Sequence, residues 1–229
     1  MSPNRLRLNM APIIPMTIEA HQLLLLLNWM SPAFPTGAFA YSHGLEWAID
    51  TGDVQSADDL EGWVADLVTQ GSGWNDAVLF ARCWDDDPIA LNGLALALCS
   101  SHERFLETTQ LGRSFVIAAG IFAPQASHDG DLAYPVAAGR ALAALRVNKA
   151  DALLAFLQGF CAALTSVAVR LVPLGQTQGL EVLRNLMSVI AAAARRADTA
   201  SLEDLGSITL HADIAAMKHE TQFSRVFRT

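Results

Sequence analysis

Apolar residues recur every three or four positions along most of the chain, most regularly within residues 150–171. The large apolar residues that recur at helical spacing in this segment are Leu153, Phe156, Leu157, Phe160, Leu164, Val167 and Leu171. Ala is the commonest residue between them, and a helix that is apolar on every side is typical of a protein core. The pattern therefore predicts a long central helix that is buried all round.

Weaker patterns of the same period, bounded by Ser, Thr, Gly and Pro, predict further helices. We expect them at about 17–29, 37–50, 56–70, 75–84, 89–99, 102–122, 134–146, 177–195 and 208–220. No segment requires a strand. The predicted fold class is all-α, a single-domain bundle of about ten helices around the central apolar helix.

The prolines of the N-terminal segment and the composition of the C-terminus divide the chain into three parts. Residues 1–16 lack helical periodicity and are expected to form a flexible extension. Residues 17–218 form the helical domain, and residues 219–229 form a tail that docks a partner.

Charge excludes one class of partner. The chain has 229 residues and a formal net charge of -8, whereas nucleic-acid binding needs clustered Lys and Arg. Acidic residues concentrate in segment 46–87 and basic residues in segment 140–196, so we expect one acidic and one mildly basic end. Complementary protein partners and a solvated acidic helix surface explain this polarity equally well.

Neither secretion nor a membrane span is favoured. A short leucine run, residues 23–27, is interrupted upstream by Glu19 and His21, unlike a signal peptide. Residues 152–169 lack charge, but the polar residues within them favour a core helix over a membrane span. Cys83, Cys99 and Cys161 have no metal-site spacing and are expected to be buried thiols in a reducing cytoplasm.

Catalytic motifs are absent from the sequence. Its two lysines, Lys149 and Lys218, follow Asn148 and Met217, so no phosphate-binding Gly-Lys motif exists. A nucleophile elbow, a zinc-binding His-Glu-x-x-His helix and a dinucleotide-binding glycine pattern are also missing. We assign no catalytic or metal-binding residue, and expect no tightly bound cofactor.

The segment SPAFPTGAFAYSHGLEWA, residues 31–48, mixes aromatic and charged residues on one side of a predicted helix. Phe39, His43 and Glu46 lie on that side, whereas Tyr41 faces the core. Aromatic residues ringed by charge are typical of a protein interface, although ordinary packing explains them equally well. His43 and Glu46 alone are too few for a metal site.

Two later segments also attract attention. In RLVPLGQTQG, residues 170–179, a helix ends near Arg170, and Gln176 and Gln178 could donate hydrogen bonds to a partner. The terminus HETQFSRVFRT, residues 219–229, is too aromatic for a frayed tail. It is expected to dock on its own core or, as we favour, on another chain. His211 and His219 are interpreted as surface residues.

In order and spacing, SPAFPTGAFAYSHGLE, RLVPLGQTQG and HETQFSRVFR resemble three conserved regions of the urease accessory protein UreF family. The resemblance implies an all-helical homodimer in the cytoplasm. Such a protein assembles with UreD (also called UreH), with the GTPase UreG and with apo-urease. It acts as a chaperone for metallocentre assembly, in nickel insertion that depends on GTP hydrolysis by UreG.

The resemblance also implies roles for individual residues. The N-terminal region and the tail would mainly bind UreD, and Arg170 with its following loop would lie near the dimer and UreG-facing surface. The implied partner-binding residues are Phe34, Phe39, Tyr41, His43, Glu46, Arg170, Gln176, His219, Glu220, Phe223, Arg225, Phe227 and Arg228. The residues that shape these regions are Ser31, Pro32, Pro35, Gly37, Gly44, Pro173, Gly175 and Gly179.

Three functions remain open at this point. The leading hypothesis is a non-catalytic scaffold that bridges UreD and UreG. An alternative is a regulator that activates or gates the GTPase, with Arg170 as a charge-stabilising finger. An independent hydrolase or metalloenzyme is the third.

Overall fold

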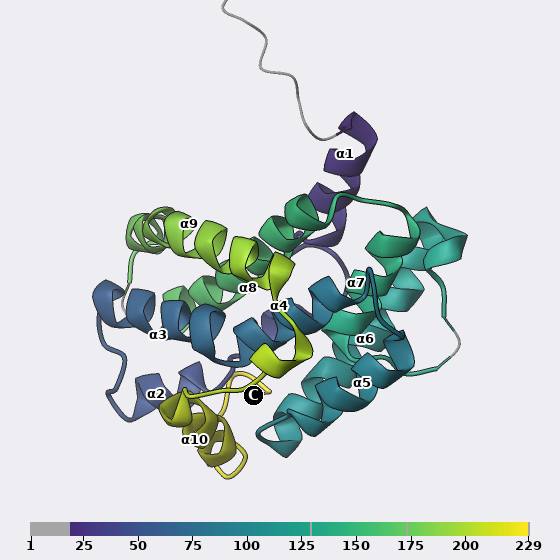
Figure 1. The fold of residues 1–229 in the computed structure, drawn as a ribbon. Helices are drawn as coiled ribbons and strands as arrows, with labels where there is room; N and C mark the ends of the chain where they lie inside the picture. Colours follow the sequence, from purple (N-terminus) through teal and green to yellow (C-terminus); the bar gives the residue numbers. More distant parts are fainter. Residues whose placement is uncertain (1–18, 129, 173, 229) are drawn as a thin grey trace, which may run out of the picture.

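A computed structural model describes residues 19–128, 130–172 and 174–228. The predicted extension, residues 1–16, lies outside the described residues, as do Pro173 and Thr229. Within the described part the chain forms α-helices and short 3₁₀ turns, with no strand (Figure 1). The predicted all-α class is therefore confirmed.

Ten α-helices occur in the described part of the chain. They are α1 (Ala20–Trp29), α2 (Leu45–Asp50), α3 (Ala57–Gln70), α4 (Ser72–Arg82), α5 (Pro88–Ala97), α6 (His102–Phe122), α7 (Tyr134–Ala144), α8 (Lys149–Leu171), α9 (Gln176–Thr199) and α10 (Leu210–His219). The 3₁₀ turns are η1 (Ala38–Ala40), η2 (Pro124–Ala126) and η3 (Leu202–Asp204).

Helix starts follow local capping chemistry. Ser56 accepts a hydrogen bond from the Asp59 amide at 3.2 Å, and the Asp59 carboxylate accepts one from the Ser56 amide at 3.0 Å. This reciprocal pair satisfies two amide groups that the first turn of α3 leaves without helical partners. The Asn148 side chain caps α8 in the same way, by accepting from the Asp151 amide at 3.1 Å.

The predicted helix at 37–50 is wrong. The chain forms the short turn η1, and α2 begins only at Leu45. Gly37, His43 and Gly44 have positive φ angles of 85°, 52° and 76°, a conformation that a right-handed helix cannot contain. The helix predicted at 75–84 also begins earlier than expected. Helix α4 starts at Ser72, directly after Gly71, and contains Gly73.

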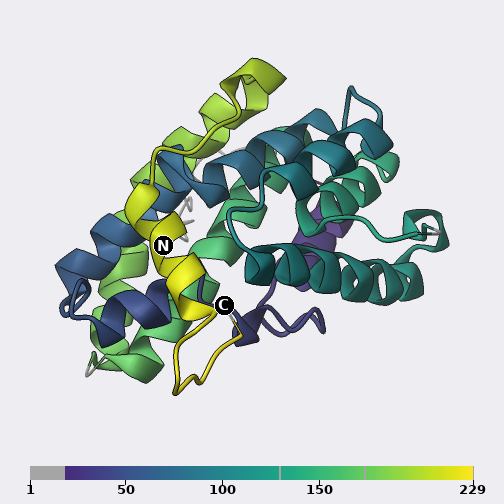
Figure 2. The same ribbon diagram turned by 90° about the horizontal axis from the view of Figure 1, so that it is seen from below.

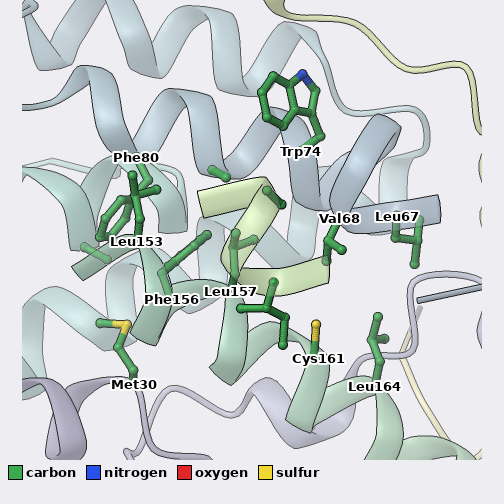
Figure 3. Close-up of a cluster of buried hydrophobic side chains, with 14 of the residues drawn as sticks. Met30, Leu67, Val68, Trp74, Phe80, Leu153, Phe156, Leu157, Cys161 and Leu164 are labelled. Carbon is green, nitrogen blue, oxygen red and sulfur yellow. The ribbon is translucent and has the colours of Figure 1, made fainter. Parts of the chain in front are cut away.

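Helix α8 is the centre of the core, as predicted, and packs against α9, α4 and α2. Figure 3 shows its side chains among core residues from other helices; those labelled on α8 are Leu153, Phe156, Leu157, Cys161 and Leu164. Burial is not complete, since Leu154 and Gln158 are exposed. By length and composition alone α8 could span a membrane, but half of its most apolar window is buried within the molecule.

The expected separation of charge into two ends is wrong. The acidic helix α3 packs directly against α9, which carries Arg184, Arg195 and Arg196 (Figure 1). A cross-helix hydrogen bond joins Asn185 to Glu61 at 2.8 Å. The two charge types are therefore neighbours on one side of the molecule.

One crossing leaves no space for a side chain. A Cβ atom placed on Gly112 of α6 would lie 1.8 Å from the carbonyl oxygen of Leu132. The segment before α7 therefore passes directly over the backbone of α6. This contact fixes the distance between α6 and the start of α7.

Candidate interaction site

The segment that joins α1 to α2 follows an irregular path over α6 and α8. The Ser31 side chain accepts from the Ala33 amide, and its carbonyl accepts from the Phe34 amide, forming a tight turn. Phe34 is then buried against the rings of Trp29 and Phe115, with centroids 6.4 and 5.6 Å away. Farther on, the ring of Phe39 is 62% exposed.

The chain after α10 folds back onto this segment (Figure 2). The Glu46 carboxylate of α2 accepts hydrogen bonds from the amides of Val226 and Phe227, at 2.6 and 2.8 Å. The Arg228 amide donates to the carbonyl of Ala40 at 2.8 Å. The last residues of segment 220–228, which is here called the tail, are thus fixed to the beginning of the domain.

A buried imidazole lies under the tail. His219 Nδ1 is 2.7 Å from Glu103 Oε2, and its Nε2 is 3.0 Å from Glu46 Oε2. The imidazole is fully buried. Arg225 reaches the other oxygen of Glu103 at 2.6 Å. Glu46, Glu103 and His219, here called the triad, therefore connect α2, α6 and α10 with the tail.

A second charged cluster lies one turn farther along α6. Glu107 pairs with Arg104 and lies 2.9 Å from His43 Nε2, while Asp76 of α4 is 3.5 Å from Arg104. Burial alone would raise the pKa of Glu107, but the charges of Arg104 and His43 outweigh it and hold the pKa at about 2. For Asp76 burial prevails over Arg104, and its pKa is raised.

This cluster forms the wall between two cavities, each of about 80 Å³. Asp76, Arg104 and Thr108 line both cavities. The first cavity lies beneath the segment before α2, with Phe39 and Tyr41 among its lining residues. The path of that segment therefore determines access to the first cavity.

Arg170, in the last turn of α8, connects the same segments. Its guanidinium donates to the carbonyl of Phe39 at 2.9 Å and lies 4.4 Å from the ring centroid of Phe227. Gln178 has a local role, since its side-chain oxygen accepts from the Gly175 amide at 3.1 Å. Gln176 is exposed at the start of α9.

Helix α10 presents an apolar stripe to solvent. Leu210, Ile214 and Met217 follow one another at helical spacing and are all at least half exposed. In the tail that follows, Phe223 is fully exposed. The opposite face of α10 packs against α2, where a Cβ atom on Gly44 would lie 2.6 Å from the Ala216 amide nitrogen.

Comparison with known protein families connects this arrangement to a function. A family model described as UreF matches residues 54–187, more than half of the chain. The chain belongs to the UreF family. A "Urease accessory protein UreF" from Methylobacterium sp. is 44% identical over 90% of the chain and 88% of its own length. For the protein of that name from Cereibacter sphaeroides the values are 47%, 90% and 98%.

Membership of the UreF family does not test which residues bind partners, so those roles stay predictions. Burial limits which of the side chains could contact a partner directly. Phe34, Tyr41, Glu46, His219 and Phe227 are buried in this conformation. A partner could therefore sense them only through the residues that they hold in place. Phe39, Phe223, Arg225 and Arg228 are exposed, as is Glu220, whose carboxylate accepts from the His102 amide at 2.7 Å.

Residues 226–228 bind Glu46 and Ala40 of the same chain, and docking of the tail on another chain stays a prediction. One expectation for this site is corrected. His219 is not a surface residue, whereas His211 is exposed as expected.

Sequence reasoning missed the contribution of α6. Glu103, Glu107 and Gln110 are spaced four and three residues apart, which places them on one helix face. Gln110 accepts from the Tyr41 hydroxyl at 2.8 Å and from Arg228 at 3.3 Å. These polar residues share one face of a helix that must pack against its neighbours, and that pattern could have revealed the contribution of α6 to the site.

No group of three His, Cys, Asp or Glu residues within residues 19–128, 130–172 and 174–228 is arranged to hold a metal ion. The thiols of Cys83 and Cys161 are buried, as predicted, and Cys99 is partly buried. Burial raises the pKa of the Cys83 and Cys161 thiols to about 12 and that of Cys99 to about 11.

Proposed function

We propose that this chain is a non-catalytic scaffold in urease maturation, which holds UreD (UreH) and the GTPase UreG together during GTP-dependent insertion of nickel into apo-urease. Membership of the UreF family supports the urease pathway. The observation that carries the scaffold role is the composite surface in which the tail is fixed on the segment before α2.

The chemistry of this surface favours protein recognition over catalysis. Its carboxylates are engaged by ring nitrogens, guanidinium groups and backbone amides of the same chain. The groups left at the surface include the rings of Phe39 and Phe223. Exposed aromatic residues beside satisfied charges are typical of the centre of a protein interface.

We assign UreD to the surface formed by α10 and the tail. The stripe of Leu210, Ile214 and Met217 provides apolar contact area, and Phe223 extends it. A surface of this kind suits an apolar groove on a partner. UreG is assigned to the neighbouring region around Arg170 and the loop that follows it, close to the contact between two copies of the chain in a homodimer.

The scaffold acts in the cytoplasm and carries no tightly bound cofactor of its own. Nickel and GTP enter the process through the partners. Equilibrium dialysis of the isolated chain against nickel is expected to detect no tight binding, and a tightly bound ion would favour the metalloenzyme hypothesis instead.

A pull-down with matched variants tests the assignment of UreD. The wild-type chain is expected to retain UreD, and Met217→Asp is expected to lose it, because a charge would replace apolar contact on the α10 stripe. Met187→Asp on α9 is the control, since Met187 is similarly exposed, 64% against 50%, but lies on another helix.

A second pull-down adds UreG to the UreD complex with GTP, with GDP and without nucleotide. The wild-type chain is expected to form the three-protein complex in at least one of these conditions. No complex in any of them would contradict the scaffold role. In the first pull-down, equal retention of UreD by the wild-type chain, Met217→Asp and Met187→Asp would contradict only the assignment of UreD to the α10 surface.

A further inference from the structure

The tail and the segment before α2 meet through a backbone hydrogen bond, from the Arg228 amide to the Ala40 carbonyl at 2.8 Å. The side chains next to this bond converge on one atom of α6. The Tyr41 hydroxyl lies 2.8 Å from Gln110 Oε1, and Arg228 Nη1 lies 3.3 Å from the same oxygen. Gln110 therefore contacts both segments at the point where they join.

The chemistry of these three side chains fixes the direction of both contacts. A guanidinium has only donors, so the amide of Gln110 must turn its oxygen, and not its nitrogen, toward Arg228. The Tyr41 hydroxyl must then donate to that oxygen. Burial raises the pKa of Tyr41 and the nearby Arg228 opposes that rise, which agrees with a hydroxyl that keeps its proton. Gln110 is thus a double acceptor, and a side chain without an acceptor would lose both contacts at once.

Gln110 is the second of two anchors that α6 offers to the tail. The first is Glu103 of the triad, which binds Arg225 at 2.6 Å. Glu103 and Gln110 are seven positions apart, which corresponds to about 10 Å along a helix. Arg225 and Arg228 are three positions apart, a distance that an extended chain spans in about 10 Å. The two arginines of the tail therefore match the two anchors in spacing.

The anchors belong to the stiffer partner. Helix α6 has 21 residues and packs against α7 and α10, whereas the tail forms only turns and bends. The position of the tail is therefore set by the anchors on α6. Val226 lies between the two arginines and is 72% exposed, so the place at which this apolar side chain is presented depends on both anchors.

We propose that Gln110 is a positioning residue, which sets the register of the tail on α6 and joins the tail to the segment before α2, so that Val226 is presented to UreD at a fixed place. The inference rests on the proposed function for the identity of this partner. Gln110 acts through Tyr41 and Arg228 and does not itself contact UreD. The register is a property of the isolated chain.

Two variants at position 110 separate the acceptor from the bulk of the side chain. Gln110→Leu removes the acceptor and keeps a side chain of similar bulk. Gln110→Glu keeps an acceptor for both partners and makes the contact with Arg228 charge-assisted. Because Gln110 is exposed, neither change alters the core. Gln158→Leu, at an exposed glutamine of α8, is the matched control.

Hydrogen exchange of the Arg228 amide in the isolated chain measures the register, because this amide is protected while it donates to Ala40. Gln110→Leu is expected to lower the protection about tenfold, through the loss of its hydrogen bonds. Gln110→Glu is expected to keep or increase the protection, and Gln158→Leu to leave it unchanged. Unchanged protection in Gln110→Leu would overturn the inference, as would equal losses in Gln110→Leu and Gln110→Glu.

A double-mutant cycle tests whether Gln110 joins the two segments. Tyr41→Phe removes only the hydroxyl, which donates to the oxygen that Arg228 also uses. The combined variant, Gln110→Leu with Tyr41→Phe, is expected to lose less protection at the Arg228 amide than the sum of the two single losses. Strictly additive losses would mean that the two contacts are independent, and would overturn the joining role.

Binding of UreD distinguishes a positioning role from direct contact. Gln110→Leu is expected to weaken UreD binding by a factor similar to its loss of protection, whereas Gln110→Glu is expected to bind like the wild-type chain. If Gln110→Glu kept its protection but lost UreD, the amide of Gln110 would itself contact the partner, and the positioning role would be wrong. If the wild-type chain did not bind UreD, only the proposed function would fail, because the exchange measurements involve no partner.

Discussion

Arg170 lies over the ring of Phe227, with 4.4 Å between the guanidinium carbon and the ring centroid. The same guanidinium donates to the carbonyl of Phe39 at 2.9 Å. One side chain at the end of α8 therefore holds together the segment before α2 and the tail.

This geometry separates two roles of Arg170. If Arg170 holds the tail in place, Arg170→Ala is expected to weaken docking of the tail. The loss of the cation–π contact and the hydrogen bond should lower the docking free energy by about 1 kcal/mol. Hydrogen exchange of the tail measures this loss. Arg184→Ala, an exposed arginine of α9, is the control. If Arg170 instead acts as a charge-stabilising finger for UreG, Arg170→Ala should leave the tail protected and should lower the rate of GTP hydrolysis by UreG by about 10³-fold or more.

Gly44 is expected to tolerate no side chain. In Gly44→Ala the new Cβ would lie 2.6 Å from the Ala216 amide nitrogen, at a φ of 76°. The clash and the strained φ together are expected to cost about 2–3 kcal/mol of unfolding free energy in urea titrations. Gly37→Ala has a similar φ of 85° but no atom within 4 Å. It should cost about 1 kcal/mol, and equal losses would argue against close packing of α10.

Glu107 gives the protein a defined sensitivity to acid. Its pKa is lowered from 4.5 to about 2, so its contribution is present above about pH 4.5 and disappears as the pH falls toward 2. Glu107→Gln is expected to cost roughly 3 kcal/mol at neutral pH and to flatten the acid side of the stability curve. Asp76 has the opposite effect on stability: burial raises its pKa, so protonation of Asp76 at acidic pH favours the folded state.

Acid titrations of unfolding free energy check this expectation. Asp131→Asn, which breaks the surface pair with Arg113, is the control and should leave the acid limb unchanged. If Glu107→Gln retained the wild-type acid limb, another group would be responsible for it.

The helices were predictable where the local signals agreed. The α6 helix has its predicted bounds at 102 and 122, and the capping pair at Ser56 marks the start of α3. The failures occurred where backbone conformation decided the outcome. Three positive φ angles divide the expected helix at 37–50, and one of them belongs to His43, a residue that does not signal such a turn.

The interaction site was predictable as a set of segments but not as an arrangement. All three segments singled out from the sequence meet in the structure through Phe39, Arg170 and Phe227. The partners of the buried carboxylates could not be inferred, because Glu46 and Phe227 are separated by 181 positions. Contacts over such distances arise from packing of the whole bundle, which local periodicity does not encode.

The crossing at Gly112 restricts how this molecule can diverge. Any side chain at that position would collide with the carbonyl of Leu132, so substitution would push apart α6 and the start of α7. Gly62 and Gly93 have no atom within 4 Å of a would-be Cβ and carry no such restriction. Among distant relatives, drift should thus accumulate at positions 62 and 93 while position 112 stays invariant.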